Sequence, residues 1–275
     1  MINAVLLFRE ALYGALVIAV ACSVLGVYVV LRRIVFVGAA LAELSSMGIA
    51  LAMWLTGIGV GLGVVTQPLV MSFVVTLVGV LFFGLGAGRS RVPPDATIGV
   101  VYAGAAALGI LLIAKAATGE AHDIFLQGNI LSITRRDTLV LLAVAVPVLI
   151  LHLVFYKEFL FVSFDSETAR TLGYRIRFWT LLLYLTLGLV IAFAMQFAGV
   201  MLVFNFLVLP AVTGLLLARG MGGMFVWAVA VAIVAAVVGF ALSVPLDLPS
   251  GPAIIAVSAV LALAAWGFRA LRPAV

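Results

Sequence analysis

The chain has 275 residues, of which 67% are hydrophobic and only 9% are charged, and its net charge at pH 7 is +5. A soluble domain carries about 25% charged residues, so this composition excludes a soluble globular protein and is typical of a polytopic helical membrane protein. The single Cys22 excludes a disulfide framework or a thiolate metal cluster within one chain.

Apolar runs of about 20 residues, each long enough to cross a bilayer, follow one another along most of the chain. They predict an all-α membrane protein with one transmembrane domain over 1–275 and about nine spans, at 11–31, 34–56, 64–87, 96–114, 138–156, 178–198, 199–218, 224–244 and 252–268. The stretch 178–218 would reach about 60 Å as one helix, twice a bilayer core. We therefore expect a turn near 196–199, with eight spans plus a re-entrant element as the alternative.

The distribution of basic residues predicts which way the chain crosses the membrane, because cytoplasmic loops are enriched in Lys and Arg. With the N-terminus outside and the C-terminus inside, eleven bases face the cytoplasm: Arg32, Arg33, Arg89, Arg91, Lys157, Arg170, Arg175, Arg177, Arg219, Arg269 and Arg272. The other four, Arg9, Lys115, Arg135 and Arg136, then face outward. The long outer segment 115–137 has an apolar middle, which we expect at the membrane interface.

Glu43 is the sharpest single candidate for a functional residue. It lies ten residues after Arg33, about 15 Å up the second span and near the bilayer midplane. A carboxylate at that depth costs roughly 2.5–3.5 kcal/mol on insertion scales, and such residues face a bundle interior or a water pathway. We interpret Glu43 as a pathway ligand for a metal ion, with Ser46 beside it. The alternative is a hydrogen-bonded Glu that holds helices together.

Four further polar residues are weaker candidates. His122 and Asp123, together with Glu120 in the outer segment, are candidates for an outer metal-entry site, since His and carboxylate ligands suit zinc; a solvated loop or a docking surface for a binding protein is the alternative. Asn205 lies in the middle of a span and either lines the pathway or forms a hydrogen bond to a neighbouring helix.

A short polar helix is predicted on the cytoplasmic side at 166–172. Asp165 can cap its amides, Glu167 suits the positive end of the helix dipole, and Gly173 can supply a left-handed terminator. The residues alone are compatible with an ordinary connector between two spans or with a helix that docks on a soluble partner.

Several segments, taken in order, resemble the permease subunits of ATP-binding-cassette importers for zinc, manganese and iron. The resemblance covers nearly the whole chain. The segments that carry it are Gly26–Arg33, Gly38–Ala42, Asp95–Gly99, Phe125–Asp137, Asp165–Gly173, Pro210–Thr213 and Asp247–Pro252.

The resemblance implies a homodimer in a bacterial or archaeal cytoplasmic membrane, with two ATPase subunits inside and a metal-binding protein outside. It assigns ATPase coupling to Asp165, Glu167, Ala169, Arg170, Leu172 and Gly173. The sequence has no phosphate-binding loop of the G-x-x-x-x-G-K-[ST] kind, so the partner would use ATP. No cofactor is expected in this chain, and the transported ion would be zinc first, then manganese or iron.

One position departs from that family. Its members usually carry Asp and His four residues apart on the second span, where this chain has Ala39 and Glu43. The open alternatives are an importer of a metal chelate, haem or cobalamin, a stand-alone secondary ion transporter that uses Glu43 as a relay, or a membrane scaffold or sensor. No Ser/His/Asp triad or HExxH motif is present, and we expect no enzyme.

Overall fold

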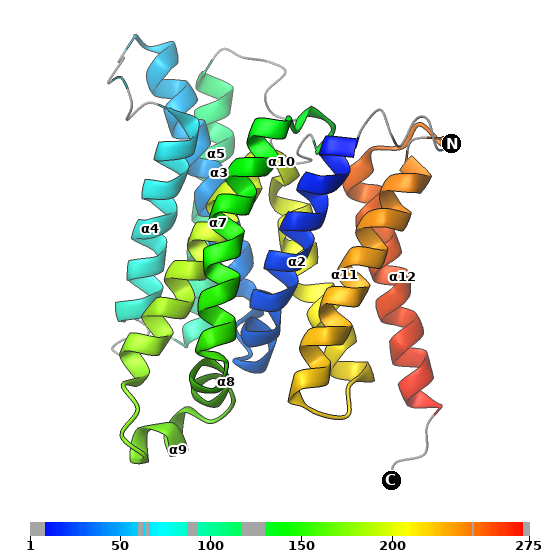
Figure 1. The fold of residues 1–275 in the computed structure, drawn as a ribbon. Coiled ribbons are helices and arrows are strands. Elements are labelled where there is room, and N and C mark those ends of the chain that lie inside the picture. Colours follow the sequence, from blue (N-terminus) through cyan, green and yellow to red (C-terminus); the bar gives the residue numbers. More distant parts are fainter. Residues whose placement is uncertain are drawn as a thin grey trace.

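The computed structural model describes residues 9–59, 63, 67–86, 93–116, 130–243 and 245–271. Over these ranges the chain is a bundle of helices without strands, which confirms the predicted class (Figure 1). Eight of the described helices are long and apolar enough to cross a membrane. They are α2 (Arg9–Leu31), α3 (Val35–Gly57), α4 (Pro68–Gly86), α5 (Pro94–Lys115), α7 (Arg135–Val154), α10 (Ile176–Leu217), α11 (Met221–Ser243) and α12 (Ser250–Ala270).

The 42-residue helix α10 is broken at Gly199, where the backbone has φ 72° and ψ 166°. That region is essentially open to glycine alone. The chain turns back there, so α10 begins beside α9 and ends beside the start of α11, at the same end of the bundle (Figure 1). Each half is long enough to span about 27 Å or more. The predicted turn is confirmed, and the described helices make nine passes through the bundle.

The interior of the bundle is built from α2, α3 and α10, which are more enclosed than the outer α5, α7 and α12. Close approach of the backbones makes this possible. A Cβ on Gly26 would overlap the carbonyl oxygen of Leu207, and one on Gly239 would lie 2.5 Å from the Cα of Ile254. Small residues at such crossings are the usual means by which membrane helices pack, since hydrocarbon gives apolar side chains no reason to associate.

The segments at the two ends of the bundle differ in detail from the prediction. The stretch expected as one connector with one helix holds two, α8 (Tyr156–Phe164) and α9 (Ser166–Thr171), with Leu172 as the C-cap. At the other end, the helical turn η2 (Ile130–Ser132) buries Ile130 to 1% exposure against the bundle rather than at the membrane interface. The rest of the expected interfacial stretch lies outside the described residues.

Candidate functional site

Glu43 lies inside the bundle, about 12 Å along α3 from its start at Val35. Its side chain is only 7% exposed. Among the described residues, no group donates a hydrogen bond to the carboxylate or pairs with it. An unpaired buried carboxylate is costly. The alternative interpretation, a Glu whose hydrogen bonds tie helices together, has no contact among the described residues to support it.

Ser46, one turn further along α3, shares these properties. It is 7% exposed and its hydroxyl has no hydrogen-bond partner in the described part of the chain. Among the described residues, two side-chain atoms are fully enclosed and have no hydrogen-bond partner, His152 Nδ1 and Asn205 Oδ1. The oxygens of Glu43 and Ser46 are not among them, so each keeps a small opening to the surface of the chain. A water-sized molecule can therefore touch both residues.

Asn205 lies in the second half of α10 and is buried. Its Nδ2 donates a hydrogen bond of 3.1 Å to Ser258 Oγ on α12. Asn205 thus makes the helix–helix contact that polar residues in mid-span commonly make, and only its enclosed Oδ1 remains without a partner. The geometry leaves its role in lining a pathway a prediction.

The described residues contain no group of three or more His, Cys, Asp or Glu side chains that could hold a metal ion. His122 and Asp123 lie outside the described residues, so their predicted role stays a prediction. Glu43 would therefore need further ligands from a second copy of the chain, from water or from the cargo itself.

The short helix α9 is held by local hydrogen bonds, as its sequence predicts. The Thr168 amide donates to Asp165 Oδ1 at 3.0 Å, and the Thr168 hydroxyl donates to Oδ2 at 2.6 Å. These bonds keep the pKa of the Asp165 carboxyl below its ordinary value, because they stabilise the ionised form. At the other end, Gly173 has φ 85° and terminates the helix.

The surface of α9 combines charged and apolar groups. Glu167 and Arg170 are exposed, and Phe164 and Leu172, which flank the helix, are 64% and 65% exposed. Ala169 is fully buried, so any contribution it makes to coupling is that of an anchor rather than a contact. The helix lies next to α8, which precedes it, and α10, which follows it.

A polar contact that sequence reasoning missed lies at the same end of the bundle. Arg32, just after α2, donates from Nε to Ser163 Oγ on α8 at 3.0 Å and from Nη1 to Thr180 Oγ1 on α10 at 3.1 Å. Arg32 thus ties three helices together. From the sequence, Arg32 beside Arg33 indicates only which side of the membrane this end of α2 faces.

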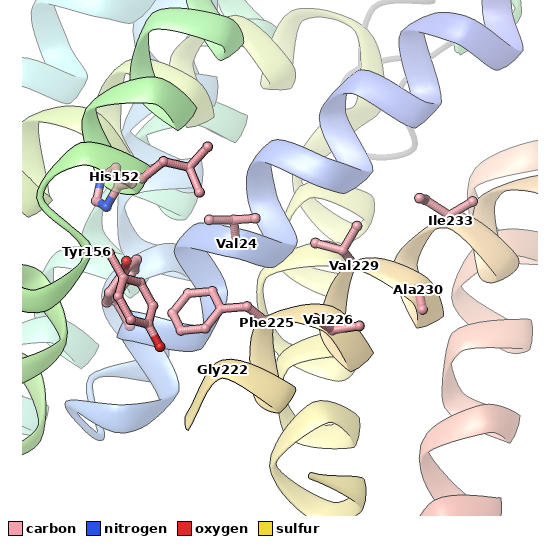
Figure 2. Close-up of a pocket in the computed structure, with 11 residues that line it drawn as sticks. Val24, His152, Tyr156, Gly222, Phe225, Val226, Val229, Ala230 and Ile233 are labelled. Carbon is pink, nitrogen blue, oxygen red and sulfur yellow. The ribbon is translucent and has the colours of Figure 1, made fainter. Parts of the chain in front are cut away.

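A second missed feature is an apolar groove of about 500 Å³ between α2, α7 and α11 (Figure 2). Tyr156 and Phe225 meet edge to face at 5.4 Å across it. His152 lies at its edge with Nε2 2.9 Å from Thr186 Oγ1. No Asp, Glu, Lys or Arg lines the groove, so its walls suit hydrocarbon rather than a hydrated ion.

The span-length apolar helices and the break in α10 at Gly199 define a polytopic helical membrane protein. A family model described as "ABC 3 transport family" matches residues 5–269. The chain belongs to this family.

The chain is similar to curated proteins over nearly its whole length. It is 31% identical to the manganese import system permease protein ScaB of Streptococcus gordonii, covering 94% of this chain and 90% of that one. It is 30% identical to the chelated iron transport system membrane protein YfeD of Yersinia pestis, covering 96% and 86%.

Solved structures share the fold. PsaBC from Streptococcus pneumoniae in complex with Fab matches with a TM-score of 0.82 at 26% identity, covering 96% of this chain and 94% of that one. An inward-facing structure of a putative metal-chelate type ABC transporter matches with a TM-score of 0.75 at 14% identity, covering 96% and 87%, and shows likeness of fold alone.

Proposed function

We propose that this chain is the permease subunit of an ABC importer that moves a divalent transition metal ion into the cytoplasm. Manganese and iron come first, because relatives over the whole length are named for them, and zinc has no such support among those relatives. ATP would be used by partner ATPase subunits, and a metal-binding protein would deliver the ion from outside to a dimer of permease chains.

The observation that carries this proposal is the position and build of α9. It is a capped, exposed two-turn helix at one end of the bundle, joined to the spans through α8 and α10 (Figure 1). A lever driven by a soluble ATPase needs a rigid element that protrudes from the membrane and contacts a span that can move. The coupling roles of Asp165, Glu167, Arg170, Leu172 and Gly173 belong to this proposal.

The charge distribution supports an orientation with α9 in the cytoplasm. Most of the described bases lie at the α9 end of the bundle: Arg32, Arg33, Lys157, Arg170, Arg175, Arg177, Arg219 and Arg269. The opposite end has Arg9, Lys115, Arg135 and Arg136. By the positive-inside rule the α9 end faces the cytoplasm of the cell, in the cytoplasmic membrane, with the start of α2 outside.

In this mechanism the two permease chains rock around a central path as ATP binds and is hydrolysed. Glu43 offers the ion a carboxylate oxygen, a ligand that suits manganese, iron and zinc. Because Glu43 makes no hydrogen bond or ion pair with the described residues, the ion need not displace any of them. A lone carboxylate binds weakly, which favours release into the cytoplasm.

An importer for a metal chelate is the second candidate. It is favoured because, among the described residues, Glu43 is the carboxylate deep within a span and no cluster of metal ligands surrounds it. A chelate brings its own ligands and needs no coordination by the path.

The test is ATP hydrolysis by the complex in liposomes, with the binding protein loaded in turn with manganese, iron and zinc. Stimulation by one loaded ion identifies that ion as the cargo, and stimulation by a metal chelate alone favours the second candidate.

The double variant Glu167→Ala, Arg170→Ala should insert and dimerise normally yet lose the ATPase on purification. Normal recovery of the ATPase with this variant contradicts the coupling role of α9.

A further inference from the structure

A cavity of about 690 Å³ lies at the α9 end of the bundle, separate from Glu43. The turn between α2 and α3, the end of α8, the first residue of α9 and both halves of α10 surround it. Its polar lining consists of Arg32, Arg33, Ser163, Ser166, Thr180 and Tyr184.

The cavity is positively charged and has no counter-charge. Arg32 and Arg33 line it, no Asp or Glu does, and neither arginine pairs with an acid in the described part of the chain. Asp165, between two lining residues, is already engaged with Thr168. Arg32 uses two N–H groups on Ser163 and Thr180, which leaves the rest of its guanidinium free to bind an anion.

The backbone at Arg33 adds an independent observation. Arg33 closes α2 with φ 59°, in the left-handed region, while its amide bonds to the carbonyl of Val30 and the amide of Ile34 bonds to that of Val29. This is the position at which helices most often carry glycine, because a Cβ there is unfavourable. An exposed arginine here places a positive charge at a conformational cost. No hydrogen bond of its side chain to a described residue offsets that cost.

The cavity adjoins the surface on which the ATPase is proposed to dock. Ser166 both begins α9 and lines the cavity, so a protein seated on α9 would reach its mouth. Covering an unpaired guanidinium removes its hydration, and this costs several kcal/mol unless an anion replaces the water. A stable complex therefore needs an anion opposite these arginines, and an acidic side chain of the docked protein is the anion that docking itself would bring there.

We infer that the ATPase subunit inserts an Asp or Glu side chain into this cavity, where it pairs with Arg32 and Arg33. This inference rests on the proposed function, since it deepens how the same partner docks. The carboxylate would form a second anchor beside α9 and tie the partner to the turn that leads directly into α3, the helix that carries Glu43.

The test is the affinity of the purified ATPase for the full-length chain in nanodiscs of neutral lipid. Arg33→Gly is the main variant, because it removes the charge while relieving the left-handed backbone, so it should fold at least as well as the wild type. Arg219→Gln, at the same end but outside the cavity, removes one charge as the matched control.

We expect Arg33→Gly to weaken ATPase binding at least about tenfold and to reduce its dependence on salt, whereas Arg219→Gln changes affinity less than about threefold. We also expect Arg33→Glu to lose binding and one Asp→Lys or Glu→Lys variant of the ATPase to restore it.

Wild-type affinity in Arg33→Gly, or equal losses in both variants, would overturn the inference while leaving the proposed function intact. So would unchanged ATPase affinity accompanied by loss of phosphatidylglycerol binding from the Arg33→Gly chain, since that assigns the cavity to a lipid phosphate. Failure of the ATPase to bind the wild-type chain would overturn the proposed function as well.

Discussion

The polar groups at the α9 end of the bundle and those on the inner part of α3 differ in how they are satisfied. At the α9 end, Asp165 is bonded to Thr168, and Arg32 to Ser163 and Thr180. On α3, the side chains of Glu43 and Ser46 are each 7% exposed and make no hydrogen bond in the described part of the chain. The groups bonded at the α9 end are satisfied within the described part of the chain, whereas the oxygens of Glu43 and Ser46 are not.

This difference separates residues whose substitution should lower the free energy of unfolding from residues whose substitution should slow transport. Partners that are bonded within the chain stabilise it, and their removal leaves polar groups unsatisfied. A carboxylate without partners contributes nothing to stability and costs free energy to bury.

Arg32→Ala should have the largest effect on stability. It removes two charge-assisted hydrogen bonds and leaves Ser163 and Thr180 without their donor, so the free energy of unfolding in detergent micelles should fall by about 2 kcal/mol. The control is Arg33→Ala, which removes a neighbouring exposed arginine whose side chain makes no hydrogen bond in the described part of the chain. If Arg32→Ala unfolds at the same denaturant concentration as this control, the α9 end is not held as described.

Asn205→Ala should have a smaller effect. The hydrogen bond to Ser258 joins α10 to α12, and such bonds within membrane helices contribute about 0.6 kcal/mol on average. A double-mutant cycle with Ser258→Ala measures the bond itself, and a coupling energy of zero would show that the two side chains do not interact.

The Asp165 cap should respond to pH in a defined direction. Its folded pKa is lowered by the Thr168 bonds, so the cap is complete above the ordinary Asp pKa of about 3.9 and is lost only as the pH falls through the lowered value. ATPase binding should therefore be insensitive to this group from pH 8 to pH 5. Loss of binding that follows titration of Asp165 within that range would contradict the cap.

The same cap can be tested by substitution. Asp165→Ala should weaken ATPase binding about threefold, whereas Asp165→Ser, another good N-cap residue, should retain affinity close to the wild type. Equal affinities of the Ala and Ser variants would show that capping of α9 does not matter for docking.

Glu43→Gln should have the smallest effect on stability, with no decrease in the free energy of unfolding. The carboxylate has no hydrogen bond to a described residue that the change could remove, and its neutral replacement is easier to bury. Destabilisation by more than about 1 kcal/mol would place Glu43 among the residues that hold the helices together and remove the contrast with Arg32.

Much of the fold follows from local signals in the sequence. Hydropathy located the spans, the length of 178–218 required a turn that falls at Gly199, and Asp165 with Gly173 marked the ends of α9. The separate helix α8 was missed because α7 ends at Val154 without a glycine or proline to mark the change of direction.

The contacts of the polar side chains could not be predicted in the same way. Arg32 meets Ser163 and Thr180 across 131 and 148 residues of chain, and only the packed bundle brings them together. For Glu43 the sequence indicated burial, through its depth in the second span. Its lack of partners depends on which faces of α4, α5 and α10 surround α3, and this is a property of the assembled fold.

The central claim is that Glu43 is unpaired because its partner is the transported ion. The most direct test is uptake of manganese into liposomes that contain the chain, its ATPase and a manganese-loaded binding protein, with wild type beside Glu43→Ala. We predict that Glu43→Ala keeps wild-type stability and ATPase binding but takes up manganese at least about tenfold more slowly, equivalent to about 1.4 kcal/mol. Uptake by Glu43→Ala at the wild-type rate would contradict the account.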